Sequence, residues 1–555
     1  MRSIDGFKFS EMVKLGSHHL FLNADYVDSL NVFPVPDGDT GTNMNLSMTS
    51  GATEIEAHAV AHIGKTAQAL SKGLLMGARG NSGVILSQLF RGFSKAIEDE
   101  AIVDGKKFAA ALKYGVETAY KAVMKPVEGT ILTVAKDAAN AGVEKSATTD
   151  NFIEVMETIV KESKASLERT PDLLAVLKEV GVVDSGGQGL VYVYEGFLAC
   201  LKGEELPART DVHAMDDLVN AEHHRSLLGF MNTEDIVYGY CTEFMVKFEA
   251  GKLENKPYDE SDFRQELSQF GDSLLVISDD EVAKVHIHSE EPGDVLTFSQ
   301  KYGSLINIKI ENMRQQHLEI VGENHTAQKS LATDAVKYPY AVVTVAMGSG
   351  IAELLKSVGA SAVIEGGQTM NPSTEDIVKA IRDVGAERVL ILPNNKNIIM
   401  AAEQAAEIIG IESAVVPTTT VPEGLAAILA FNPEADVSVN ANAMTDAASY
   451  VKTAQVTHAV RDTTIDGIAI KKNEFMGISA GNIVTTNASL EEVTKNLLSL
   501  VIDEEAEIVT ILYGEDVSEE EATVIVRYIE ASFDHVEVEH YNGKQPLYPY
   551  IISVE

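Results

Sequence analysis

The chain has 555 residues, of which 44 are basic and 83 acidic, so its formal net charge at pH 7 is −39. A surface this acidic repels nucleic acids and anionic membranes, so we expect no nucleic-acid partner and no direct membrane insertion. The length predicts several domains, and a hydrophobic content of 45% is enough to fill their cores. Two cysteines are too few for a disulfide framework, and neither a signal peptide nor a long apolar run is evident, which predicts a cytoplasmic protein.

The composition divides the chain into several segments. Residues 1–205 are rich in Ala, Leu and Met with little alternation, which predicts an all-α domain. A polar, Pro-containing break follows, and we expect residues 206–230 to be a linker. Residues 231–325 predict an α+β middle domain, and residues 338–555, in which strands alternate with helices, predict an α/β C-terminal domain.

The loop NVFPVPDGDTGTNM, which begins at Asn31, carries the most informative chemistry. Its two prolines exclude a helix, and Asp37 and Asp39 follow just before a segment with the composition of a helix. Mg²⁺ is commonly held by one or two carboxylates together with substrate phosphates, and helix N-termini bind phosphates. The loop therefore predicts a Mg-nucleotide site, although Asp-Gly-Asp by itself is also typical of a solvated turn.

The neighbouring residues exclude two other kinds of site. An EF-hand that started at Asp37 would need glycine where Thr42 stands and glutamate where Met48 stands. A P-loop that ended in the Gly-Lys-Thr around Lys65 would need a glycine where Ala59 stands. Any nucleotide site in this domain is therefore of another kind.

Three more glycine-rich segments stand beside predicted helices of the first domain. They are residues 76–83 (MGARGNSG), 126–133 (PVEGTILT) and 184–189 (DSGGQG). Each offers backbone N–H groups without bulky side chains, which suits an anion. A single segment of this kind is more typical of a helix–helix turn. Four in one helical domain predict that several turns converge on one phosphate-rich ligand.

These motifs resemble those of a known family. PDGDTGTNM, GARGNSGV, KPVEGTILTV and VVDSGGQG are similar to the signatures of the nucleotide-binding domain of dihydroxyacetone kinases, an antiparallel helical barrel that holds Mg-ATP at one end. VFPVPDGDTG and GLLMGARGNSG resemble more particularly the ATP-binding subunit of bacterial fatty acid kinase, and the resemblance extends over essentially the whole chain. It implies a homodimeric kinase that phosphorylates the carboxylate of a fatty acid presented by a separate fatty-acid-binding protein, giving acyl phosphate for phospholipid synthesis.

The resemblance also implies roles for single residues. Asp37 and Asp39 would be catalytic as ligands of Mg²⁺. The residues expected to line the nucleotide are Thr42, Asn43, Asn81, Ser82, Gly129, Thr130, Asp184 and Gly186. Dihydroxyacetone kinases have a third aspartate upstream of the pair, whereas the nearest polar residue here is Asn31, so the number of metal ions stays open.

The middle segment predicts the order βαββαβ, the split-βαβ or ferredoxin-like plan. In that plan the first and third strands lie side by side. The alternation of the third strand then puts His286 and His288 on the same side as Cys241 of the first strand. One thiol and two imidazoles could bind Zn²⁺, although His-x-His on a strand is more often an ordinary exposed pair. The resemblance favours zinc, because the family's middle domain carries a Cys/His zinc site, in a structural role or in acceptor handling.

From Tyr338 onward the alternation of strands and helices predicts one parallel, doubly wound sheet, with Ser373 as an N-cap. Ligands usually bind at the carboxyl ends of such strands, which carry residues 348–350, 365–368 and 394–396. Structural turns are favoured there over a second nucleotide site, because the third glycine of a dinucleotide fingerprint is missing. The resemblance assigns this part to contact with the fatty-acid-binding partner.

Three functions are consistent with these features. A carboxylate acceptor is ionised at neutral pH and needs no general base, and none of the four glycine segments contains a histidine, which favours a fatty acid as acceptor. The alternatives are a kinase for a small dihydroxyacetone-like molecule and a non-catalytic scaffold that senses ATP. The additional domains argue against the first alternative, and the retention of both aspartates argues against the second.

Overall fold

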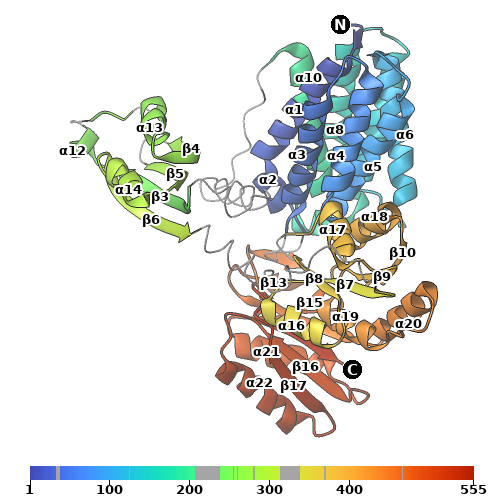
Figure 1. Cartoon of the computed structure of the whole chain (residues 1–555), viewed down its shortest axis with the longest axis vertical. Helices are drawn as coiled ribbons and strands as arrows, with labels where there is room; N and C mark the ends of the chain where they lie inside the picture. The colour runs from blue at the N-terminus through green and yellow to red at the C-terminus, as the bar shows by residue number, and fades with distance from the viewer. Residues whose placement is uncertain are drawn as a thin grey trace, which may run out of the picture. The chain divides into compact units, whose positions relative to one another are not determined.

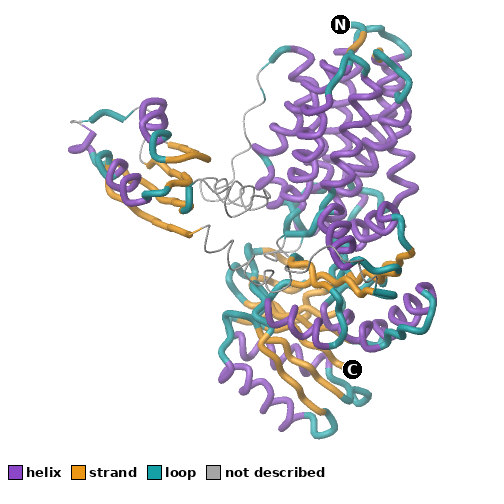
Figure 2. Tube along the Cα trace, in the orientation of Figure 1, coloured by secondary structure: helices purple, strands orange, loops and turns teal. Residues whose placement is uncertain are grey.

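The computed structural model describes residues 1–32, 38–123, 125–204, 206, 238–253, 256–258, 260–278, 282–312, 338–367, 370–465 and 467–555. These residues form two compact units (Figures 1 and 2). One unit is made of residues 1–210 and 336–555, and the other of residues 211–335. The two ends of the chain therefore fold together, while the middle segment is a unit of its own.

The N-terminal part of the first unit is helical. Its helices are α1 (Gly6–Leu22), α2 (Ala24–Ser29), α3 (Thr40–His58), α4 (Ile63–Gly77), α5 (Gly80–Ala96), α6 (Gly105–Ala122), α7 (Ile131–Ser146), α8 (Phe152–Leu173), α9 (Ala175–Val180) and α10 (Ser185–Lys202). The strands β1 (Ser3–Ile4) and β2 (Val103–Asp104) form a short antiparallel pair. The longer helices α1, α3, α4, α5, α6, α7, α8 and α10 each pack on the next, and α10 packs on α1, so they close a ring. Figure 1 shows this group of helices from the side. The predicted helical domain is confirmed.

Aromatic side chains fill the inside of this ring. Phe93 stacks on Phe9 and meets Phe108 edge-on, and Phe108 meets Phe152 in the same way. These four rings come from four different helices, and each is almost fully buried. Edge-to-face and offset contacts between rings stabilise a core beyond the burial of apolar area. The helices are thus held around one shared core.

The middle unit has the elements β3 (Tyr240–Phe248), α12 (Ala250–Leu253), α13 (Glu260–Leu267), β4 (Gly271–Ser278), β5 (Val282–Ser289), α14 (Pro292–Ser299) and β6 (Gly303–Asn312). The strand order is β4-β5-β3-β6, and every neighbouring pair is antiparallel. The first and third strands, β3 and β5, therefore lie side by side at the centre, as the split-βαβ plan predicts. Val285 and Ile287 of β5 are buried in one core with Phe263 of α13 and Phe298 of α14.

The C-terminal part begins with a parallel sheet. Its strands are β7 (Ala341–Ala346), β8 (Ala362–Glu365), β9 (Arg388–Leu392) and β10 (Glu412–Val415), in the order β10-β9-β7-β8. Its helices are α16 (Ser349–Ser357), α17 (Thr374–Val384), α18 (Ile399–Ile409), α19 (Val421–Leu429) and α20 (Val437–Ser449). α17 and α18 share a core with one face of β7, and α16, α19 and α20 with the other. This sheet is doubly wound as predicted, and Ser373 forms a capping box with Asp376 at the start of α17.

A second sheet follows, and here the prediction of one parallel sheet through residue 555 is wrong. Its strands are β11 (Lys452–His458), β14 (Phe475–Ser479), β15 (Asn482–Asn487), β16 (Ile508–Tyr513), β17 (Glu537–Asn542) and β18 (Tyr550–Val554), in the order β15-β14-β11-β18-β16-β17. Only β16 and β17 pair in parallel; the other neighbours are antiparallel. The helices α21 (Leu490–Val501) and α22 (Glu519–Ser532) cover one face, and the strands β12 (Thr463–Ile465) and β13 (Ile468–Ile470) form a separate hairpin.

The physical reason for this difference lies in the connections. β14 and β15 are joined by Ala480 and Gly481, both with positive φ. A two-residue turn of this kind joins antiparallel neighbours, whereas a parallel pair needs a crossover of a dozen or more residues. β18 then enters between β11 and β16, antiparallel to both.

Candidate nucleotide-binding site

A cavity of about 410 Å³ lies in the first unit, with walls from both ends of the chain. Its helical wall includes the predicted site residues Asp39, Asn43, Asn81, Ser82 and Asp184. Its other wall comes from the C-terminal part and includes residues 394–397 and 419–421. The volume is in the range of about 300–1,000 Å³ that is usual for small-molecule and cofactor sites.

Asp39 stands at the N-cap position of α3 and is held by the C-terminal part of the chain. The Asn371 amide nitrogen donates to Asp39 Oδ2 at 2.6 Å and lies 3.5 Å from Asn43 Oδ1. Asn371 is 1% exposed and stands just before α17. One carboxylate oxygen of Asp39 is thus fixed by a buried amide that the sequence analysis did not find.

The start of α3 is held by Asp28, another residue that the sequence analysis missed. Asp28 Oδ1 accepts from the Gly41 amide at 2.5 Å, and Asp28 Oδ2 accepts from the Thr42 hydroxyl at 2.7 Å. First-turn N–H groups that we expected to meet phosphates are therefore bonded to a carboxylate. Thr42 does not line the cavity. One feature of the sequence could have indicated Asp28: it is an acidic residue in the last turn of the short α2. The helix dipole disfavours a negative charge at that end, so such a residue usually has another partner.

Burial raises the pKa of Asp28 from its usual 3.8 to about 7, although hydrogen bonds from Thr42 and Gly41 favour the ionised carboxylate.

Asn31 stands between Asp28 and the aspartate pair in the sequence, and both polar atoms of its side-chain amide form hydrogen bonds. Asn31 Nδ2 donates to the Asp28 carbonyl at 2.8 Å, and Asn31 Oδ1 accepts from the Thr40 hydroxyl at 2.7 Å. Asp37 lies outside the described residues.

Arg461 of the C-terminal part contacts the backbone just before the aspartate loop. Its guanidinium donates to the backbone carbonyls of Ser29 and Asn31, and to that of Val32 at 3.0 Å. A planar guanidinium can hold several acceptors in a fixed geometry. The backbone that leads into the aspartate loop is therefore fixed by a residue from the far end of the chain.

Asn81 and Ser82 lie in the first turn of α5, directly after Gly80, whose backbone conformation and close neighbours favour glycine. Gly80 has φ +56°, and a Cβ there would lie 2.5 Å from Asn43 Nδ2. This close approach brings the starts of α3 and α5 together. Asn81 Nδ2 lies 3.4 Å from Asn397 Oδ1, so the first turn of α5 also meets the C-terminal wall.

Asp184 joins two helix starts at the edge of the cavity. It accepts from the Gly187 amide at 2.7 Å, which caps α10, and from the backbone of Ile131 at the start of α7. Burial raises the pKa of Asp184 to about 6. Gly186 follows in the first turn of α10 and does not line the cavity.

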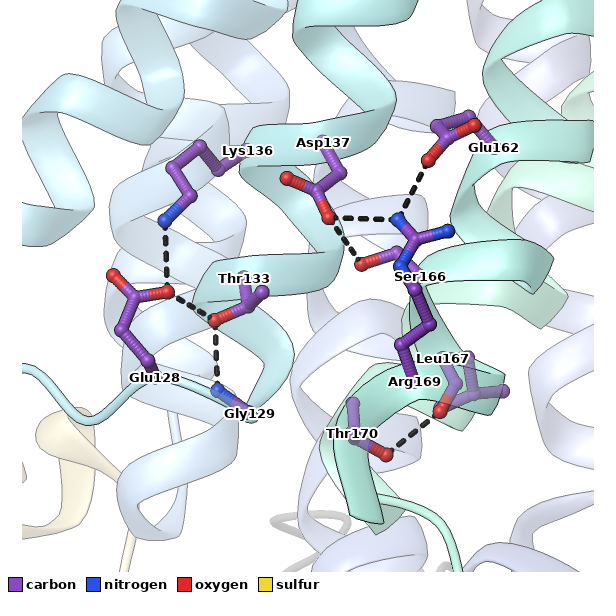
Figure 3. A network of polar contacts seen from close by, with 10 residues as sticks. All are labelled: Glu128, Gly129, Thr133, Lys136, Asp137, Glu162, Ser166, Leu167, Arg169 and Thr170. Carbon is purple, nitrogen blue, oxygen red and sulfur yellow. Dashed lines mark hydrogen bonds and ion pairs between the residues drawn. The ribbon is translucent and has the colours of Figure 1, made fainter. Parts of the chain in front are cut away.

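The segment that contains Gly129 and Thr130 is held by local bonds and does not line the cavity either (Figure 3). The Gly129 amide, with φ +85°, donates to Thr133 Oγ1 at 2.9 Å, and that hydroxyl donates to Glu128 at 2.6 Å. The Thr130 hydroxyl donates to the Val127 carbonyl at 2.8 Å. In this structure the segment shapes the start of α7, and Asp184, not Gly129 or Thr130, lines the cavity.

The predicted zinc site lies in the middle unit, on β3 and β5. The strand register pairs Cys241 with His288, and Glu243 with His286. The side chains of Cys241, His286 and His288 are outside the described part of the structure, so zinc binding stays a prediction. No described helix is both long and apolar enough to span a bilayer.

Comparisons with known proteins agree with this architecture. A DAK2 domain matches residues 34–199, the middle domain of FakA-like fatty acid kinase proteins matches residues 237–320, and their C-terminal domain matches residues 341–555. Protein YloV of Bacillus subtilis (strain 168) is 58% identical over 555 residues, which is all of both chains. A protein of Staphylococcus aureus (strain USA300) is 53% identical over 553 residues, covering 100% of this chain and 99% of that one.

Two solved structures match parts of the chain. The dihydroxyacetone kinase from C. freundii in complex with AMP-PNP and Mg²⁺ is 20% identical, covering 34% of this chain and 33% of that one, with a TM-score of 0.27. The DegV family protein Cg2579 from Corynebacterium glutamicum is 16% identical, covering 39% of this chain and 96% of that one, with a TM-score of 0.31. The family assignment comes from the full-length relatives and the three matched domains: the chain belongs to the FakA-like family of fatty acid kinase proteins.

Proposed function

We propose that the chain is the ATP-binding subunit of a two-component fatty acid kinase. It transfers the γ-phosphoryl group of ATP to the carboxylate of a fatty acid that a separate fatty-acid-binding protein presents, giving acyl phosphate for phospholipid synthesis. Membership of the family, with its DAK2 domain, supports ATP-dependent kinase activity. The observation that carries the proposal is the cavity in which residues of three predicted nucleotide motifs, Asp39, Asn81 and Asp184, meet.

The residues of the cavity fit a Mg-nucleotide. Asp39 offers carboxylate oxygen, the ligand type that Mg²⁺ prefers, and Asp37 would add a second carboxylate. Bound there, Mg²⁺ would neutralise charge on the phosphates. Asn43, Asn81 and Ser82 provide amide and hydroxyl groups that can donate to phosphate oxygens. Thr42, Gly129, Thr130 and Gly186 do not line the cavity, and we assign to them the shaping of the helix starts around it.

The lining of the cavity also suits an acceptor that is already ionised. A fatty acid carboxylate attacks without losing a proton, so the kinase needs no general base. The described residues that line the cavity include no histidine. This agrees with a carboxylate acceptor.

Further parts of the proposal extend to the rest of the chain. Residues 1–205 would be the kinase domain, 206–230 a linker, 231–325 the middle domain and 338–555 the partner-binding domain. Cys241, His286 and His288 would hold Zn²⁺, and the protein would act as a cytoplasmic homodimer.

Zinc content measured on the purified protein and on the Cys241→Ser variant tests the zinc assignment. The loss of one equivalent of zinc in the variant supports the assignment, and the absence of zinc from both proteins contradicts it.

The function is tested by trapping acyl phosphate as hydroxamate. The full-length chain is incubated with ATP, Mg²⁺ and a fatty acid, with and without a fatty-acid-binding protein of the family's partner type. We expect product only when the partner is present. Turnover of free dihydroxyacetone, or nucleotide binding with no phosphorylated product, would favour one of the alternatives instead.

The Asp39→Ala variant tests the metal assignment in the same assay. Loss of the carboxylate should lower the rate of product formation by at least about 100-fold, because charge on the phosphates is no longer neutralised. Asp99→Asn, at an exposed residue outside the cavity, is the matched control and should keep the wild-type rate. A folded Asp39→Ala protein with full activity would exclude Asp39 as a ligand that catalysis needs.

A further inference from the structure

Asn371, which stands just before α17, places its side chain between two helix starts of the ring. Its amide nitrogen donates to Asp39 Oδ2 at 2.6 Å and lies 3.5 Å from Asn43 Oδ1, both at the start of α3. A Cβ at Gly80, the first residue of α5, would lie 3.4 Å from the same nitrogen. Asn371 is 1% exposed. Its side chain therefore fills the space beside Asp39, at the proposed metal site.

The backbone around Asn371 is held in this place by the GARGNSG motif. Arg79 Nη1 donates to the Asn371 carbonyl at 2.8 Å, and the guanidinium lies 3.3 Å from the carboxylate of Asp376. The Thr374 amide donates to the Ala78 carbonyl at 3.1 Å. The side chain of Arg79 is 12% exposed, so little water competes for these bonds. A defined set of contacts thus brings the Asn371 side chain to the helix starts.

The same arrangement leaves two buried oxygen atoms without hydrogen bonds. The side-chain oxygen of Asn371 is buried and has no hydrogen-bond partner among the described residues, and the same is true of the side-chain oxygen of Asn81. A buried polar atom of this kind costs free energy, because its hydrogen bonds to water are lost and not replaced. The Asn371 side chain is therefore held in a position that a ligand of Asp39 can compete for.

The position of the amide conflicts with metal binding at Asp39. The amide hydrogens carry positive partial charge, and one of them is donated to Oδ2 of the carboxylate. A Mg²⁺ ion on the same carboxylate would be repelled by these hydrogens. Mg²⁺ also requires a regular octahedral shell of oxygen atoms, which an N–H group cannot join. The Asn371 amide and Mg²⁺ therefore compete for Asp39.

We propose that Asn371 is an autoinhibitory residue, whose side chain keeps Mg²⁺ from Asp39 and has to leave before a Mg-nucleotide binds. The apparent affinity for the Mg-nucleotide is then the intrinsic affinity multiplied by the fraction of molecules in which Asp39 is released. The start of α3 supplies the metal ligand, and the C-terminal part limits access to it. This inference rests on the proposed Mg-nucleotide site and adds a control of that site from within the chain.

Calorimetric titration of full-length protein tests this competition. Wild type is compared with Asn371→Ala, which removes the amide, and with Asn371→Leu, which removes the donor and keeps a similar side-chain volume. Each protein is titrated with Mg-ADP and, in Mg²⁺-free buffer, with ADP alone. Asn496→Ala, at an exposed position of α21, is the matched control. Circular dichroism and the thermal unfolding midpoint check that each variant is folded; if one Asn371 variant does not fold, the other decides.

We expect both Asn371 variants to bind Mg-ADP about 5-fold or more tighter than wild type, because no contact has to be broken first. ADP alone should bind to all the proteins within about 2-fold of one another, because the amide competes with the metal and not with the nucleotide. A residue that only supported the site would give the opposite sign, with weaker Mg-ADP binding after its removal. Asn496→Ala should match wild type with both ligands.

The outcomes separate this inference from the proposed function. Mg-ADP binding that is unchanged or weaker in the Asn371 variants would overturn the inference, and the proposed function would stand if wild type forms acyl phosphate in the hydroxamate assay. Tighter Mg-ADP binding in the variants, without acyl phosphate from wild type, would support the inference and contradict the proposed function. An equal gain for Mg-ADP and for ADP alone, or no Mg-ADP binding by any of the proteins, would also overturn the inference.

Discussion

At the scale of single residues, Asp28 shows how a carboxylate can order the wall of a cavity without lining the cavity itself. It accepts from the Gly41 amide and from the Thr42 hydroxyl, so it fixes the first turn of α3 beside Asp39. Burial raises its pKa to about 7, with a smaller contribution from the charge of Asp25. The folded protein therefore binds the Asp28 proton more tightly than the unfolded chain does.

This difference in proton affinity predicts the effect of pH on stability. Because the pKa of Asp28 is raised from 3.8 to about 7, its contribution to the free energy of unfolding is largest at the acidic end and falls as the pH rises from about 4 to about 7. Asp28→Asn cannot titrate but can still accept a hydrogen bond from Thr42, so its unfolding midpoint should fall less over this range. Circular dichroism melts at intervals between about pH 4.5 and about pH 7.5, with Asp99→Asn as the control, measure this; parallel curves for wild type and Asp28→Asn would contradict it.

The same scale shows which site residues can be predicted from the sequence. Asp39, Asn81 and Asp184 each stand within two residues of a glycine at the start of a helix, and all three line the cavity. These residues can be predicted from the local sequence because glycine and short polar residues are typical of helix starts. Asn371 has no such mark, since its importance comes from a contact with Asp39 across 332 positions of the chain.

At the scale of elements, the helical ring depends on the close approach of α10 to α1. A Cβ at Gly196 would lie 2.5 Å from the Cα of Gly16 and 2.7 Å from the carbonyl oxygen of Leu15. Both atoms belong to the backbone, so a side-chain rotation cannot relieve the overlap. Glycine at this point lets the last helix of the ring pack directly on the first.

Gly196→Ala should therefore destabilise the helical domain. Moving α10 away from α1 loosens a well-packed core, and overpacking of this kind typically costs about 1–3 kcal/mol. Urea-induced unfolding followed by circular dichroism gives this free energy. Gly293→Ala in α14, where a Cβ has open space, is the matched control and should be neutral or slightly stabilising. Equal stability of Gly196→Ala and wild type would show that the helices separate easily.

The sheets show where prediction from patterns stops at this scale. The apolar run of β7 predicts a parallel strand buried on both faces, and β7 is one. β18 is also buried along its whole length, yet both its neighbours are antiparallel. Tyr550 and Ile552 pack toward α21 and α22, whereas Ile551 packs with the core of the first sheet. An apolar run indicates that both faces are covered, and the direction of pairing has to come from the connections.

At the scale of the whole molecule, the two ends of the chain meet in one unit and share the cavity. Asn371 binds Asp39, Arg79 reaches Asp376, and Arg461 binds the backbone before the aspartate loop. These contacts join the DAK2 domain and the segment before it to the FakA-like C-terminal domain. The part of the chain that the resemblance assigns to partner contact thus also shapes the cavity that we propose as the nucleotide site.

Arg461 tests this connection because its side-chain hydrogen bonds within the described part of the chain all go to the backbone before the aspartate loop. It contacts the carbonyls of Ser29, Asn31 and Val32 and does not line the cavity. Arg461→Ala should leave the backbone of residues 29–32 less ordered. Mg-ADP binding must then include the cost of ordering this backbone, and affinity should fall by about 10-fold, or about 1.4 kcal/mol. Arg461→Lys should recover only part of this loss, because an ammonium group lacks the planar fork.

Calorimetric titration of full-length protein with Mg-ADP measures the effect, and Arg527→Ala, at an exposed position of α22, is the control. If Arg461→Ala binds Mg-ADP as wild type does, the C-terminal part does not stabilise the loop in solution. If its affinity falls while its unfolding midpoint stays within about 2 °C of wild type, the loss comes from the loop and not from general unfolding. The second result is the one that a nucleotide site built by both ends of the chain requires.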